Sequence, residues 1–79
     1  MKEQDLIDLG FERVDEYTEE GDYHYYVYDF TKYFSLITCT DNEVEDDRWH
    51  VEFFDDNDVR FYSKDDVKTL IELIERNKI

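Results

Sequence analysis

Polar and apolar residues alternate along most of the chain, and only its two ends show the three- and four-residue apolar spacing of a helix. The pattern predicts helices over residues 2–9 and 63–77 and strands over residues 11–17, 23–30, 33–40, 48–53 and 59–62. The short connections favour an antiparallel meander, and the apolar stripe of the last helix must pack on one sheet face. We therefore predict a single α+β domain over residues 1–79, in the order α-β-β-β-β-β-α, with both helices on one face of a five-stranded sheet.

Two local signals mark where the helices stop and start. Gly10 follows Leu9 and precedes Phe11, which is typical of a helix that ends with a glycine at positive φ. Ser63 precedes the final helix as its N-cap, with Asp66 placed to complete an acidic capping box.

The central strand is the aromatic run over residues 23–30, and it is followed almost at once by the strand over residues 33–40. A two-residue loop, Thr31-Lys32, would place Val27 opposite Leu36. The same register sets Tyr26 opposite Ile37 and His24 opposite Cys39, and a four-residue loop would keep its parity.

Both faces of the aromatic strand carry large side chains, so the two helices cannot cover all of them. We expect the helix-covered face to hold Val27, Leu36, Trp49, Val51, Phe53, Val59 and Phe61. Tyr26, Tyr28, Tyr33 and Ile37 would then lie on the open face. These tyrosines either lie on a partly solvated sheet surface without a function, or they form an aromatic face for a partner or for self-association.

The charge of the chain narrows the classes of partner. Of its 79 residues, 23 are acidic and 9 are lysine or arginine, giving a net charge of −14. Such a charge repels phosphate backbones and anionic membranes, so we expect neither nucleic acid nor membrane as a direct partner. The aromatic content of 18% argues against disorder. One cysteine, no apolar signal segment and no membrane-spanning run favour a cytoplasmic protein.

Alternate connections of a meander lie at the same end of its sheet, and this predicts one strongly acidic end. The acids come from the turn around residues 18–22 and from the loop over residues 41–47. They are Asp15, Glu16, Glu19, Glu20, Asp22, Asp41, Glu43, Glu45, Asp46 and Asp47. Either these loops are simply solvated, or the end docks on a basic partner, by charge complementarity or by imitating a phosphate array.

Metal binding and catalysis are weaker alternatives. The runs Asp41-x-Glu43-x-Glu45 and Asp55-Asp56-Asn57-Asp58 offer oxygen ligands for calcium, but neither has the glycine and distal glutamate of an EF-hand loop. A Cys39–His24 pair, with His50 nearby, sits among carboxylates that disfavour a thiolate. No phosphate-binding glycine loop or cofactor fingerprint is present, so we predict no metal site, no cofactor and no enzymatic activity.

The opening "DLIDLGFERV" and the closing "VRFYSKDDVKTLIELIERNKI" resemble small uncharacterised acidic proteins of bacteriophages and prophages. The resemblance implies an accessory inhibitor of host defence or nucleic-acid-handling proteins, acting in the host cytoplasm, and it carries no functional residue with it. The leading hypothesis is thus a non-enzymatic module that docks an acidic surface on a basic partner. The alternatives are a protein that self-associates through its aromatic face and a calcium-responsive binding domain.

Overall fold

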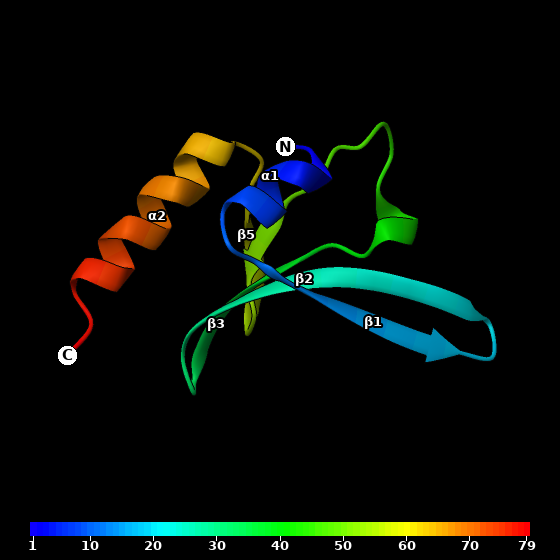
Figure 1. Cartoon of the computed structure of the whole chain (residues 1–79), viewed down its shortest axis with the longest axis horizontal. Coiled ribbons are helices and arrows are strands. Elements are labelled where there is room, and N and C mark those ends of the chain that lie inside the picture. The colour runs from blue at the N-terminus through cyan, green and yellow to red at the C-terminus, as the bar shows by residue number, and fades with distance from the viewer.

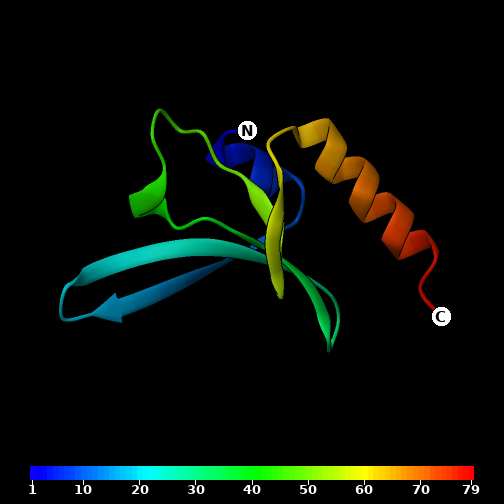
Figure 2. The ribbon, with the colours of Figure 1, turned by 180° about the vertical axis from the view of Figure 1, so that it is seen from behind.

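The computed structural model describes residues 1–79 and has the predicted α+β fold. Five antiparallel strands form one sheet in the order β1-β2-β3-β4-β5, and the two helices lie on the same side of it (Figures 1 and 2). The elements are α1 (Glu3–Asp8), β1 (Glu12–Thr18), β2 (Gly21–Thr31), β3 (Phe34–Thr38), the 3-10 turn η1 (Asp41–Glu43), β4 (Val51–Phe53), β5 (Asp56–Phe61) and α2 (Lys64–Arg76). No helix is long and apolar enough to cross a membrane.

The glycine stop after α1 is confirmed. Gly10 has φ +94°, a conformation that side-chain-bearing residues rarely adopt. Its N–H donates to the Ile7 carbonyl at 3.1 Å, and the Phe11 N–H donates to the Leu6 carbonyl at 3.0 Å. This reversal brings Phe11 back over α1 and into the core.

The predicted β2–β3 register was wrong by one residue. Val27 pairs with Ile37 and Tyr28 with Leu36, because the connecting turn is Lys32-Tyr33 and a register shift falls between Asp29 and Thr31. A one-residue slip exchanges the two faces of a strand. His24 therefore does not lie opposite Cys39, and Tyr26 moves to the opposite face from the one predicted.

The core accordingly contains Tyr26, which was expected on the open face, together with Phe30 on the same face of β2. Tyr26 is 2% exposed and Phe30 5%, beside Leu36, Trp49 and Val51. Tyr28, Phe53 and Phe61 pack against this core while partly buried. Val27 is only half-buried and Val59 is 47% exposed, so these two were wrongly placed in the core.

The strand predicted over residues 48–53 is shorter than expected, since only Val51–Phe53 pairs as β4. The N-terminal residue occupies the place where the strand would have begun. The Trp49 N–H donates to the Met1 carbonyl at 2.7 Å, and the Met1 ammonium donates to the Trp49 and Tyr62 carbonyls at 3.2 and 2.8 Å. Trp49 is nevertheless buried, as its alternation with Val51 predicted.

The last helix begins and ends close to its predicted bounds. Ser63 caps it by accepting a hydrogen bond from the Asp66 N–H at 3.4 Å. Val67 and Ile71 point from α2 into the core, and they are 0% and 9% exposed. Lys78, just beyond the helix, donates to the Phe30 carbonyl of β2 at 2.8 Å.

Candidate functional site

The two acidic connections lie at one end of the molecule. The β1–β2 hairpin projects beyond the rest of the sheet, and η1 with the loop that follows it stands beside it (Figures 1 and 2). Asp41 of η1 ties the two together, because its carboxylate accepts a hydrogen bond from the His24 backbone N–H of β2 at 2.9 Å.

Half of the ten predicted acids are already bound within the fold. Their partners are an arginine, a tyrosine hydroxyl, a histidine, a threonine and backbone or indole N–H groups. These five acids are Asp15 with Arg13, Glu16 with Tyr25, Asp41 with His24, Glu43 with Thr40, and Asp47 with Glu3 and Trp49.

The other five acids make no hydrogen bond or ion pair through their side chains, and all five are exposed. We call them the acidic end: Glu19, Glu20, Asp22, Glu45 and Asp46. Two come from the hairpin turn, one from the start of β2 and two from the loop after η1. Asp46 and Asp47 both have φ +54°, and the side chain of Asp47 fixes this bend by accepting from the Trp49 indole N–H at 3.0 Å.

His24 is the residue that joins the hairpin to the rest of the fold. Its Nε2 lies 2.6 Å from the Glu3 carboxylate of α1, and its Nδ1 lies 3.3 Å from the Asp41 carboxylate of η1. The Tyr26 hydroxyl donates to the same Glu3 oxygen at 2.7 Å. The imidazole thus connects three elements when both of its nitrogens carry a proton.

The titration behaviour of this cluster follows from those contacts. Partial burial of Glu3 raises its pKa, but hydrogen bonds from Tyr26 and His24 outweigh that effect and lower it. The bond from the His24 backbone N–H lowers the pKa of Asp41. Burial and the bond to Glu3 raise the pKa of Tyr26 to about 12.

The three tyrosines predicted to form an aromatic face do not come together. Tyr26 is in the core, and Tyr28 packs on Phe11 and Phe30 with ring centroids 5.5 and 5.0 Å apart. Only Tyr33, in the β2–β3 turn, is widely exposed, at 82%. Tyr26 and Tyr28 were assigned to the open face because of the register error.

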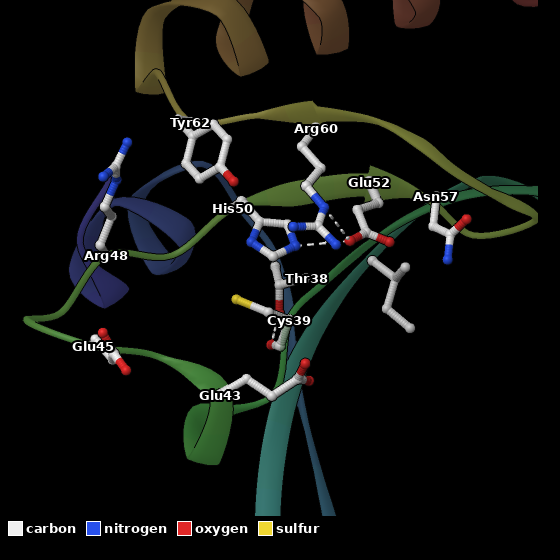
Figure 3. Close-up of a pocket in the computed structure, with 11 residues that line it drawn as sticks. Thr38, Cys39, Glu43, Glu45, Arg48, His50, Glu52, Asn57, Arg60 and Tyr62 are labelled. Atoms are coloured by element: carbon white, nitrogen blue, oxygen red, sulfur yellow. Dashed lines mark hydrogen bonds and ion pairs between the residues drawn. The ribbon is translucent and has the colours of Figure 1, made fainter.

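A polar pocket of about 580 Å³ lies on the open face of β3, β4 and β5, next to η1 (Figure 3). The Glu52 carboxylate lies within it, 2.7 Å from His50 Nε2 and 3.3 Å from Arg60 Nε. The Tyr62 ring stands between His50, at a centroid distance of 5.5 Å, and the Arg48 guanidinium, 4.9 Å from its centroid. Glu43 and Glu45 reach the pocket from the η1 side.

Most of the reactive and charged side chains that line this pocket are buried, ion-paired or stacked on a neighbour. Cys39 is 8% exposed, and burial raises the pKa of its thiol, which disfavours a reactive thiolate. The Glu52 carboxylate is held by both His50 and Arg60. Arg48 makes no ion pair despite its acidic neighbours, and it stacks on Tyr62 instead.

The hypothesis of a calcium site depends on oxygen ligands that converge. No group of three or more histidine, cysteine, aspartate or glutamate side chains is gathered in a way that could hold a metal ion.

Comparison with known proteins gives no assignment: no family model, no curated protein and no solved structure matches the chain. The function therefore has to be argued from the geometry of this chain.

The pocket was not predicted from the sequence, although the chain carries one signal of it. The alternation over residues 48–53 places Arg48, His50 and Glu52 on the same face. The pairing of Glu52 with Arg60 and with Ile37 completes the pocket, and this pairing depends on the registers of β3, β4 and β5.

Proposed function

We propose that this protein is a non-enzymatic binding module that docks its acidic end on a basic surface of a partner protein. The observation that carries the proposal is the division of the ten acids. Five are satisfied inside the fold, and the five of the acidic end are exposed without a partner at the projecting hairpin and the loop beside it.

The physical basis is long-range electrostatic attraction. Unpaired surface carboxylates raise the local negative potential, which accelerates encounter with basic surfaces and repels acidic ones. The arginines near the acidic end do not cancel it: Arg13 is paired with Asp15, and Arg48, which keeps its charge while it stacks on Tyr62, offsets one of the five exposed carboxylates. The net charge of −14 acts in the same direction.

The partner class follows from the charge and from the resemblance to phage proteins. Proteins that bind nucleic acids carry basic surfaces, and inhibitors that cover such surfaces must be acidic there. A host protein of defence or nucleic-acid handling, met in the host cytoplasm, is therefore the partner that we propose.

The test compares two variants with the same net charge in a pull-down from bacterial lysate. One neutralises the hairpin turn (Glu19→Gln, Glu20→Gln, Asp22→Asn), and the other neutralises three exposed acids elsewhere (Asp55→Asn, Asp58→Asn, Glu72→Gln). We expect a protein retained by the wild type and by the second variant, released by added salt, and lost by the first variant. Equal retention by both variants, or retention insensitive to salt, would contradict electrostatic docking.

A second candidate function is self-association, favoured by a different observation. Tyr33 is 82% and Phe54 59% exposed, and both line a hollow at the opposite end of the sheet from the acidic end. Exposed aromatic side chains are enriched at interfaces. Sedimentation of the wild type and of a Tyr33→Ser, Phe54→Ser variant tests this: a dimer lost in the variant supports it, and a monomer in both rejects it.

A further inference from the structure

The outer edge of β1 is the longest regular stretch of unpaired backbone in the sheet. β1 is a terminal strand, and its seven residues, Glu12–Thr18, pair with β2 without any register shift. Native edges are usually protected by charged side chains, lysine above all, by proline, by a bulge or by short length. β1 has no lysine, proline or bulge and is protected only by its charged residues, most of them acidic, whereas the opposite edge strand, β5, has a register shift in its pairing.

The hydrogen bonds of β2 show which β1 groups face outward. The Tyr26 N–H donates to Thr38 and the His24 N–H to Asp41, so both point away from β1. In an antiparallel pair, opposite residues either exchange both backbone bonds or neither. Arg13 and Asp15, which lie opposite Tyr26 and His24, therefore direct their N–H and C=O groups to the outer edge.

The side chains along this edge select the charge of an added strand. Glu12 and Glu16 lie on the open face with Val14 between them, and Asp15 lies on the other face. The one cation of the strand, Arg13, is paired with Asp15 at 3.0 Å. In an antiparallel pairing of two copies centred on Val14, Arg13 would lie opposite Asp15, but on the open face Glu12 would lie opposite Glu16, and this like-charge pairing is unfavourable.

We infer that the β1 edge binds an extended basic segment of the partner by strand addition. The main chain of the segment pairs with the outward groups of Arg13 and Asp15. On the open face, lysines or arginines four residues apart lie opposite Glu12 and Glu16, with an apolar residue opposite Val14; Glu16 accepts a single bond within the fold, from the Tyr25 hydroxyl at 3.3 Å, so its carboxylate can also accept from a cation. This inference rests on the proposed function and specifies how the hairpin holds the basic partner.

Two variants of one residue separate the backbone contribution from that of charge. Asp15→Pro removes an outward N–H that the fold does not use, and proline is tolerated at such edge positions. Asp15→Asn removes the same charge and keeps the N–H. The probe is a fluorescent peptide containing Lys-Thr-Val-Thr-Lys, and its affinity is measured by anisotropy at low salt. We expect Asp15→Pro to bind about ten-fold more weakly than Asp15→Asn, the loss of roughly one hydrogen bond.

Amide hydrogen exchange of the wild type provides a readout that does not depend on whether the proline variant folds. Bound peptide should slow exchange of the Arg13 and Asp15 amides, which face the outer edge. Peptide binding without that protection, or equal affinity of the two folded variants, overturns strand addition and leaves electrostatic docking standing. Failure of the peptide to bind while the lysate partner is still captured also overturns it, whereas failure of both experiments rejects the proposed function as well.

Discussion

At the scale of single residues, the Glu3 carboxylate is the contact on which the hairpin depends. It receives His24 Nε2 at 2.6 Å and the Tyr26 hydroxyl at 2.7 Å, so one side chain of α1 binds two side chains of β2. Asp41 holds the other nitrogen of His24. These contacts position the hairpin whose tip and outer edge we propose to bind the partner.

Substitution of Glu3 by glutamine should destabilise the fold by about 1 kcal/mol, since hydrogen bonds to a charged group are lost while the site is one-third exposed. The pKa of Glu3 is lowered in the fold, so its contribution is present above the usual carboxyl range of about pH 4 and is lost as pH falls. Urea unfolding at pH 7 and at pH 3 measures both effects. Glu72→Gln, on the exposed side of α2, serves as the control; an equal loss in both variants would contradict the role of Glu3.

The raised pKa of Tyr26 predicts how the stability of the fold falls at alkaline pH. Its pKa rises to about 12 in the fold, so its contribution is complete below the usual tyrosine pKa of about 10 and is lost as pH rises through 12. Tyr26→Phe should cost about 1 kcal/mol at neutral pH and flatten the fall in stability between those values. Tyr33→Phe, at a site 82% exposed, should change neither quantity. An unaltered alkaline profile in Tyr26→Phe would exclude this titration.

At the scale of elements, α2 is attached to the sheet through few side chains. Val67 and Ile71 supply its fully buried contacts, whereas Leu73 is 48% exposed. The Lys78 bond to Phe30 anchors its far end to β2.

Val67→Ala should therefore lower the free energy of unfolding by about 2 kcal/mol, through lost burial and a residual cavity. Leu73→Ala on the same helix should change it by less than about 0.5 kcal/mol. Urea titrations followed by circular dichroism compare the two. Similar losses for both would show that the helix does not pack as described.

How far the sequence predicts this fold also differs by element. Local chemistry predicted that α1 stops at Gly10 and that α2 starts after Ser63. It also predicted the burial of Trp49 and Val51, which alternate with polar residues. The faces of β2 were exchanged because Tyr23 to Phe30 is aromatic on both sides, so no apolar alternation fixes its register. The register of β2 and β3 is set instead by the shift between Asp29 and Thr31. β4 is shorter than predicted because Trp49 bonds to Met1, a tertiary contact.

The same limits apply to the candidate site. Meander topology was enough to predict that the turn around residues 18–22 and the loop over residues 41–47 share one end. Sequence could not tell which acids the fold would bind, because the contacts of Asp41 with His24 and of Asp47 with Trp49 join residues placed by tertiary structure. The acidic end is what remains after those contacts form.

At the scale of the whole molecule, the exposed, unpaired acids lie at the end of the molecule from which the β1–β2 hairpin projects (Figure 1). The molecule measures 42 × 26 × 24 Å, and the acidic hairpin lies along its long axis at one extremity. A net charge of −14 attracts basic surfaces, and we propose that a basic partner approaches the projecting hairpin. Tyr33, in the β2–β3 turn, and Phe54, which lines the same hollow, are exposed at the other end of β2 from the hairpin turn.

The most direct test of this account is to map where a basic ligand binds, by following backbone amide chemical shifts while the Lys-Thr-Val-Thr-Lys peptide is added at low salt. We expect shifts concentrated in β1, the hairpin turn and the loop after η1, which disappear as salt is raised. Shifts of equal size around α2 and the β4–β5 turn, or shifts that persist at high salt, would contradict it.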